Sequence, residues 1–179
     1  MFIEDITLAT IVGYMGVAAN ICWPLMRKRK HLLSGQVVAC LLMFTHFVLI
    51  GANTGAAIMG VAGAQAALAI PLEKNIRFKY VYLASIALTP IVCIETWQGA
   101  QSVFSSLALA VVCIANFQLN QLRQRAMLIT AIFAWLIHNC MVGSVPGIVS
   151  NILAFIISTH MLFVTAKASR DIVQKQSTA

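Results

Sequence analysis

Seven apolar stretches, each roughly long enough to cross a bilayer as a helix, fill nearly the whole of this chain. They lie at about 6–26, 33–51, 54–71, 80–94, 101–118, 126–142 and 146–166. A helix needs ~20 mostly apolar residues to cross ~30 Å of hydrocarbon. Because 60% of the residues are hydrophobic and only 9% are charged, the sequence predicts an all-α membrane protein. We expect seven transmembrane helices in a single membrane domain over residues 1–179.

The basic residues are confined to alternate connections between these stretches. All 12 Lys and Arg lie in the connections at 27–31, 72–79 and 119–125 or in the tail at 167–179. The opposite side carries Glu4, Asp5 and Glu95 instead. By the positive-inside rule, the N-terminus is expected outside and the C-terminal tail in the cytoplasm. The net charge of +7 is then an orientation signal, so the expected partner is the lipid bilayer and no nucleic acid.

A short motif occurs twice, in FTHFVLIGANTG (44–55) and in WLIHNCMVGSVPG (135–147). Adding 92 to the positions of its histidine and two glycines in the first copy gives those in the second: His46, Gly51 and Gly55 become His138, Gly143 and Gly147. One helix between two three-helix units returns the second unit to the orientation of the first. The motif therefore predicts two parallel repeats, at 6–71 and 101–166, joined by a linker helix at 80–94, as in many transporters.

The glycines and histidines of this motif have different expected roles. We expect the glycines to make the tight outer turn after the second helix of each repeat. His46 and His138 are expected at one depth, at the seam between the repeats, where an ionisable side chain is a functional hypothesis by default. Packing is an equal alternative, with each neutral ring hydrogen-bonded to a neighbouring helix. A third alternative is a b-type haem held by both rings, although we favour no cofactor and no metal.

Five further residues inside the predicted spans are candidates for a binding site. Asn20 and Asn116 lie on small, polar faces of the first and fifth helices, and aligning them needs a four-residue gap because they differ by 96. Gln65 and Asn151 are polar residues of the third and seventh helices. Trp135 lies one turn before His138, and its indole could stack on a ring of a substrate. Small and polar faces also serve close packing of membrane helices, so both interpretations stay open.

The stretches WLIHN with the following GS (Trp135 to Ser144) and THFVLIG (45–51), together with the length and span count, resemble the YgjV-like family of bacterial inner-membrane proteins. The resemblance covers essentially the whole chain. That family is distantly similar to the SWEET and PQ-loop carriers, which have a 3+1+3 helix arrangement. The resemblance implies an inner-membrane location and a sugar or a vitamin-like substrate. The chain departs from the PQ-loop pattern, since Pro24-Leu25 and Phe117-Gln118 stand where Pro-Gln pairs are expected.

These observations predict a SWEET-like transporter or facilitator of a small neutral or weakly polar metabolite, working by alternating access. A proton relay of Asp and Glu is not expected, because the spans contain no carboxylate apart from Glu95 at an outer margin. An enzyme is not expected, because no nucleophile has a base at a suitable spacing. A non-transporting scaffold or receptor is the main alternative, and the chain could form a homo-oligomer in either case.

Overall fold

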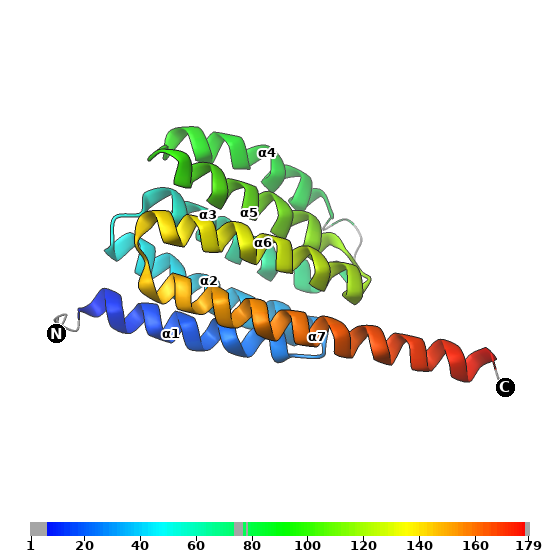
Figure 1. The fold of residues 1–179 in the computed structure, drawn as a ribbon. Coiled ribbons are helices and arrows are strands. Elements are labelled where there is room, and N and C mark those ends of the chain that lie inside the picture. The colour runs from blue at the N-terminus through cyan, green and yellow to red at the C-terminus, as the bar shows by residue number, and fades with distance from the viewer. Residues whose placement is uncertain (1–6, 74–76, 78, 178–179) are drawn as a thin grey trace, which may run out of the picture.

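The computed structural model describes residues 7–73, 77 and 79–177, and within them the chain is helical with no strand. Figure 1 shows its α-helices: α1 (Leu8–Cys22), α2 (Arg29–Leu49), α3 (Asn53–Ala69), α4 (Lys79–Glu95), α5 (Ala100–Phe117), α6 (Gln121–Val142) and α7 (Val145–Ser177). Two short 3-10 helices, η1 (Trp23–Leu25) and η2 (Ile70–Glu73), follow α1 and α3. The prediction of seven helices is confirmed. Glu4 and Asp5, which entered the orientation argument, lie outside the described residues, as do positions 74–76 and 78.

Six of the helices form a closed ring. Neighbours in the ring contact each other in the order α1, α2, α3, α5, α6 and α7, and α7 contacts α1 again. The helix α4 lies outside this ring against α3 and α5, at the top of Figure 1. The start of α1 and the end of α7 lie at opposite ends of the bundle, and α7 runs on beyond the other helices (Figure 1). Any central site is therefore enclosed by six helices.

Within the part of the chain that the structure describes, four segments are long and apolar enough to cross a membrane on their own: Leu8–Leu25, Arg29–Leu49, Gln121–Val142 and Val145–Arg170. Two shorter apolar segments, Leu83–Glu95 and Ala100–Asn116, belong to α4 and α5. The helix α3 consists largely of Ala and Gly, and it contacts α2, α4 and α5. Small residues allow such close helix packing, so α3 has less need of large lipid-facing side chains. Length and composition therefore confirm four of the predicted spans.

Two helices begin earlier than predicted and one ends later. The helix α2 begins at Arg29 and α6 at Gln121, inside the predicted loops at 27–31 and 119–125, and α7 continues through the predicted tail to Ser177. Arg, Lys and Gln are good helix formers, so the end of an apolar run does not end the helix. Arg29 and Arg125 are each only 4% exposed, although the sequence places both of them in predicted connections.

The outside of the bundle is apolar, whereas its interior holds many polar side chains. Large side chains such as Ile11, Leu41 and Phe163 are exposed. The buried polar side chains include Arg29, Gln36, His46, Thr54, Gln65, Asn116, Gln124, Arg125, His138 and Asn139. A polar group in hydrocarbon has no water to bond, so it must find partners inside the protein. This distribution is that of a protein surrounded by lipid.

Gly51 and Gly143 make the two tight turns after α2 and α6, as the motif predicted. Both have a left-handed backbone, with φ of 74° and 69°. No atom lies within 4 Å of the place where a Cβ would stand, so the backbone conformation alone favours glycine at these positions.

The same backbone hydrogen bond closes each turn. The Ala52 N–H donates to the Phe47 carbonyl at 2.9 Å, and the Ser144 N–H donates to the Asn139 carbonyl at 3.1 Å. Each donor and each acceptor in the second bond is 92 positions after its equivalent in the first. The two connections therefore have matching geometry.

Candidate functional site

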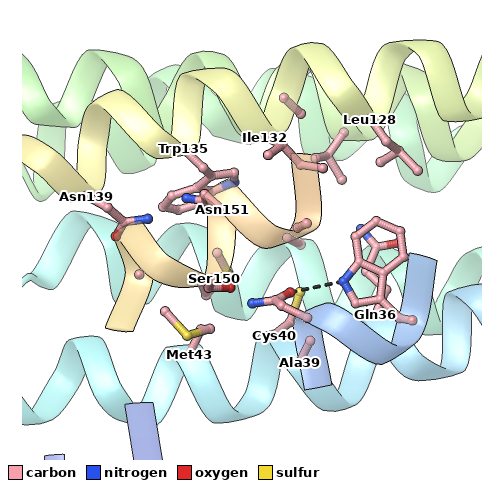
Figure 2. Close-up of a pocket in the computed structure, with 18 residues that line it drawn as sticks. Gln36, Ala39, Cys40, Met43, Leu128, Ile132, Trp135, Asn139, Ser150 and Asn151 are labelled. Atoms are coloured by element: carbon pink, nitrogen blue, oxygen red, sulfur yellow. Dashed lines mark hydrogen bonds between the residues drawn. The ribbon is translucent and has the colours of Figure 1, made fainter. Parts of the chain in front are cut away.

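A small cavity lies at the centre of the six-helix ring. Its volume is about 60 Å³, and every helix of the ring contributes to its wall. Figure 2 shows that α2 supplies one side of this wall, with Gln36, Cys40 and Met43, and that α6 supplies the facing side, with Ile132 and Trp135. The cavity is therefore shared by the first and second halves of the chain.

Most of the lining residues form pairs whose members are 92 positions apart. There are seven pairs: Asn20 with Val112, Gln36 with Leu128, Ala39 with Ala131, Cys40 with Ile132, Met43 with Trp135, Met59 with Asn151, and Ala62 with Ala154. The pairs extend over every helix of the ring. The counterpart of Asn20 is therefore Val112, reached without a gap, and Asn116 does not line the cavity.

Four buried polar side chains in the cavity wall carry an atom without a hydrogen-bond partner. These atoms are Gln36 Oε1, Asn139 Oδ1, Ser150 Oγ and Asn151 Nδ2. None of the four side chains is more than 9% exposed. A buried polar atom without a partner costs about 1–3 kcal/mol. A bound polar molecule would remove this cost, so these atoms identify the cavity as a candidate binding site.

Three of the residues predicted from the sequence line this cavity: Asn20, Trp135 and Asn151. Asn20 Oδ1 accepts a hydrogen bond of 3.0 Å from Trp23 Nε1, drawn as the dashed line in Figure 2. Trp135 stacks on Phe47 with ring centroids 6.0 Å apart. An indole held in this way offers a rigid apolar surface to a ligand.

Gln65 and Asn116, also predicted from the sequence, lie outside the cavity and join helices. The Gln65 carboxamide on α3 bonds the Cys113 thiol on α5, with Nε2 to Sγ at 2.7 Å and Sγ to Oε1 at 3.0 Å. Asn116 is fully buried at the end of α5, where its Oδ1 accepts from Gln124 Nε2 at 3.5 Å. Their polar groups serve the packing of the bundle.

His46 and His138 each bond a carbonyl on the neighbouring helix. His46 Nδ1 donates to the Ala9 carbonyl at 2.9 Å, and His138 Nδ1 donates to the Gln101 carbonyl at 2.8 Å. The two carbonyls are themselves 92 positions apart. Because a carbonyl can only accept, each neutral ring has its proton on Nδ1 and an acceptor at Nε2.

The other ring nitrogen distinguishes the two histidines. His46 Nε2 accepts from the Ser144 hydroxyl at 2.9 Å, which links α2 to the connection between α6 and α7. His138 Nε2 has no partner, although the ring is 1% exposed. The residue equivalent to Ser144 in the first half is Ala52, which has no hydroxyl. Only one of the two possible histidine–serine links is therefore present.

The contact between Ser144 and His46 also has the geometry of a nucleophile and its base. His46 lines an open depression of about 460 Å³ between the start of α1 and the connection before α7. Ser144 is only 2% exposed, however, and its Oγ also accepts a bond of 3.1 Å from the Gly147 N–H. That bond is an N-cap of α7, so we assign Ser144 to holding the helix start.

The second glycine of each motif copy lies inside a helix, and the prediction that it forms part of the turn is wrong. A Cβ at Gly55 in α3 would lie 2.8 Å from His138 Nε2. A Cβ at Gly147 in α7 would collide with Asn139 Oδ1 and lie 2.8 Å from Ser144 Oγ. Both glycines are therefore required by the close approach of polar side chains.

Neither histidine offers what a haem iron needs. Both nitrogens of His46 are hydrogen-bonded, and His138 Nε2 faces Gly55 without room for even a methyl group. The haem alternative does not fit this arrangement. Over residues 7–73, 77 and 79–177, no three His, Cys, Asp or Glu side chains gather where they could hold a metal ion.

Two buried arginines connect the halves at the end of the bundle away from the histidines. One terminal nitrogen of Arg29 donates to the Asn116 carbonyl, and one of Arg125 donates to the Pro24 carbonyl, each at 2.9 Å. The second terminal nitrogen of each donates to a further carbonyl near a helix end. The Pro24 and Asn116 carbonyls are 92 positions apart. The last carbonyls of a helix lack partners within it and attract cations.

Sequence reasoning missed Gln36, Asn139 and Ser150. Gln36 and Asn139 do carry a signal, because a carboxamide in an apolar span is costly without a role, and Asn139 directly follows His138. Ser150 carries little signal, because serine is common where membrane helices pack closely.

The difference between Ala52 and Ser144 gives a stability prediction. Ala52→Ser should supply the missing partner of His138 Nε2 and stabilise the protein by about 1 kcal/mol, whereas Ser144→Ala should destabilise it by a similar amount. Thermal unfolding of the purified protein in detergent measures both effects. The gain from Ala52→Ser should vanish when His138 is also replaced by Leu, and the exposed Ala64→Ser serves as control. A gain that persists without His138 would contradict the proposed bond.

Comparison with known proteins places the chain in a family. A search of curated proteins gave no significant match, and neither did a search of solved structures. The family model Imp-YgjV, described as a bacterial inner membrane protein, matches residues 7–168. The match extends over the ring, the cavity and α4, and it agrees with the apolar exterior of the bundle. This multi-pass chain therefore belongs to the Imp-YgjV family of bacterial inner membrane proteins.

Proposed function

We propose that this protein transports a small neutral metabolite across the bacterial inner membrane. In this proposal α1–α3 and α5–α7 are two parallel repeats, and α4 is the linker. The observation that carries the proposal is the set of seven residue pairs, 92 positions apart, that line one cavity. Two repeats related by an axis along the membrane normal put equivalent residues on opposite walls of a central site, as in transporters of this design.

The proposed orientation has the N-terminus outside and the C-terminus in the cytoplasm. Arg27, Lys28 and Lys30 are exposed near the start of α2, and Arg123 is exposed near the start of α6. Helix directions put these residues at the same end of the bundle. Basic residues favour the cytoplasmic side, so the turns at Gly51 and Gly143 would face outward.

A neutral substrate follows from the chemistry of the cavity wall. No Lys, Arg, Asp, Glu or His is among the described residues that line it. Its polar groups are four carboxamides, the Ser150 hydroxyl, the Cys40 thiol and two indole N–H groups. A charged substrate buried there would have no counter-charge to offset its desolvation. A scaffold or receptor would gain nothing from the four unpartnered polar atoms, which favours a site for a ligand. We propose no catalytic activity.

Alternating access fits the way in which the two ends of the cavity are closed. At 60 Å³ the cavity is well below the roughly 300–1,000 Å³ of typical ligand sites, so it must widen to admit a metabolite. The bond between His46 and Ser144 joins the halves at the proposed outer end. The arginines Arg29 and Arg125 join them at the proposed inner end. Breaking the bonds at one end while those at the other end stay intact would open the cavity to one side of the membrane only.

Ligand binding to the cavity is the first test. The full chain in detergent is screened by thermal shift against sugars, nucleosides, vitamins and neutral amides, since a ligand at a hundredfold excess over its Kd stabilises by about 2.7 kcal/mol. Filling the cavity with Ala39→Leu or with its counterpart Ala131→Leu should abolish the shift. His46→Ala, which alters closure rather than the cavity wall, should bind with changed affinity.

The control is Ala64→Leu, at an exposed position of α3, which should bind like the wild type. Uptake into proteoliposomes of any compound that binds then separates transport from mere recognition. Absence of binding by all compounds, or binding that survives both cavity-filling variants, would contradict the proposed site.

The inner closure can be tested with the native Cys40 in the cavity wall. In a chain whose other four cysteines are replaced by serine or alanine, Arg125→Met removes charge-assisted hydrogen bonds worth about 1.5 kcal/mol or more, so the open form should rise roughly tenfold. N-ethylmaleimide should then modify Cys40 correspondingly faster. The matched control is Arg123→Met, because Arg123 is exposed on the same helix. Equal rates in the two variants would refute the closure by Arg125.

A further inference from the structure

Resting on the proposed function, we propose that the substrate is a small neutral carboxamide or lactam with an apolar body, and that Asn139, Ser150 and Asn151 hold its amide group. The class is narrower than a neutral metabolite and excludes sugars. It follows from where the unpartnered polar atoms lie and from what stands opposite them.

The three polar side chains lie at one level of the cavity. Asn139 is three residues before the end of α6 at Val142, while Ser150 and Asn151 are five and six residues after the start of α7 at Val145. At ~1.5 Å of rise per residue, all three lie roughly 5–9 Å from the same end of the bundle. Figure 2 shows them grouped beside Trp135 on the wall formed by α6 and α7. They form a single polar cluster.

The other half of the chain has no equivalent cluster. The residues 92 positions before Asn139, Ser150 and Asn151 are Phe47, Ile58 and Met59. Of these, Met59 lines the cavity. The cavity therefore has paired positions and unequal chemistry, so it would hold a ligand in one orientation, with its polar edge against α6 and α7.

An amide group matches this cluster. A carboxamide side chain presents an acceptor and a donor side by side, and Ser150 adds one of each. A ligand amide presents the same two kinds of group in the reverse sense, so its carbonyl can accept from Asn151 Nδ2 and its N–H can donate to Ser150 Oγ. The unpartnered Ser150 Oγ and Asn151 Nδ2 would then gain partners, while the Asn139 carboxamide, whose Oδ1 packs on Gly147, can donate from Nδ2 to the same carbonyl.

The rest of the wall suits an apolar body. Met43, Met59 and Trp135 line the space beside the cluster, and thioethers and an indole pack well on flat or apolar groups. Gln36 Oε1 is the one other unpartnered atom among the described lining residues. Gln36 belongs to α2 and lies away from the cluster (Figure 2). A sugar carries hydroxyls around its whole ring. Each hydroxyl left unpaired against this wall would weaken binding roughly tenfold.

The test compares two sets of probes on the full-length chain in detergent. Benzamide, 2-pyridone and uracil represent amides and lactams, and glucose, ribose and inositol represent polyols. Kd is measured for each from the change in tryptophan fluorescence and confirmed by thermal shift. At least one amide should bind at least tenfold more tightly than any polyol.

Variants then locate the amide contact. Asn151→Met gives the second half the residue that Met59 supplies in the first, and Ser150→Ala removes a single oxygen. Each should weaken amide binding roughly tenfold, while the matched control Ile152→Met, at an exposed position of α7, should leave it within about twofold. The unfolding temperature without ligand shows that each variant is folded, and Ser150→Ala keeps the test valid if Asn151→Met does not fold.

Every other outcome overturns the inference. Polyols that bind as tightly as the amides, or amide binding unchanged in both Asn151→Met and Ser150→Ala, would refute it and leave transport of a neutral molecule standing. Failure of all six probes to bind would also refute it, and the broader screen with the cavity-filling variants then decides the proposed function separately.

Discussion

A polar group inside a bilayer has no water to bond, and the rest of this structure depends on that constraint. The chain meets it by turning polar side chains inward and bonding them between helices. His46 bonds a carbonyl of α1, Gln65 bonds the thiol of Cys113, and Arg29 bonds carbonyls at two helix ends. Because these groups have partners inside the protein, the buried polar atoms that have none indicate where a ligand could bind. Four of them lie in the wall of one cavity, where a ligand could complete their hydrogen bonds.

The two halves share geometry and differ in chemistry. Each has a left-handed glycine, a histidine bonded to the first turn of a neighbouring helix, and an arginine that reaches a helix end of the other half. Serine replaces alanine at one turn, and asparagine replaces methionine in the cavity wall. The proposed parallel repeats account for the shared shape, and the differences between them would allow an asymmetric ligand to be recognised. The bonds proposed to close the cavity at its two ends also run from one half of the chain to the other.

Much of the fold could be predicted from hydropathy and a few special residues. The apolar stretches predicted seven helices because a bilayer leaves few alternatives, and Gly51 and Gly143 were identified as turns because a histidine-based motif repeats around them. The ends of helices were less predictable. Arg29 and Gln121 were assigned to loops, since charge and polarity end an apolar run without ending a helix.

The candidate site was predictable only in part. Asn20, Trp135 and Asn151 were chosen as polar or aromatic residues within spans, and they line the cavity. Gln65 and Asn116 satisfied the same criterion and instead join helices. The direction in which a helix residue points depends on how the helix is rotated in the bundle, and that rotation is set by packing against several neighbours. A single sequence does not encode it in any simple pattern. The 92-residue offset of the motif pairs Gln36 with Leu128. That pairing indicates a binding site only once the cavity that both residues line is known.

The most direct test of two parallel repeats is the side of the membrane on which equivalent turns lie. Single cysteines are placed in a cysteine-free chain at Asn53 and Val145, which are exposed and 92 positions apart, and at Lys28 and Asn120, which are equally exposed and spaced. Labelling with a maleimide that does not cross the membrane is measured in intact spheroplasts. We predict that the maleimide labels Asn53→Cys and Val145→Cys in intact spheroplasts. Cysteines at Lys28 and Asn120 should be labelled only after the membrane has been opened. Labelling of Asn53→Cys and Val145→Cys from opposite sides would contradict parallel repeats.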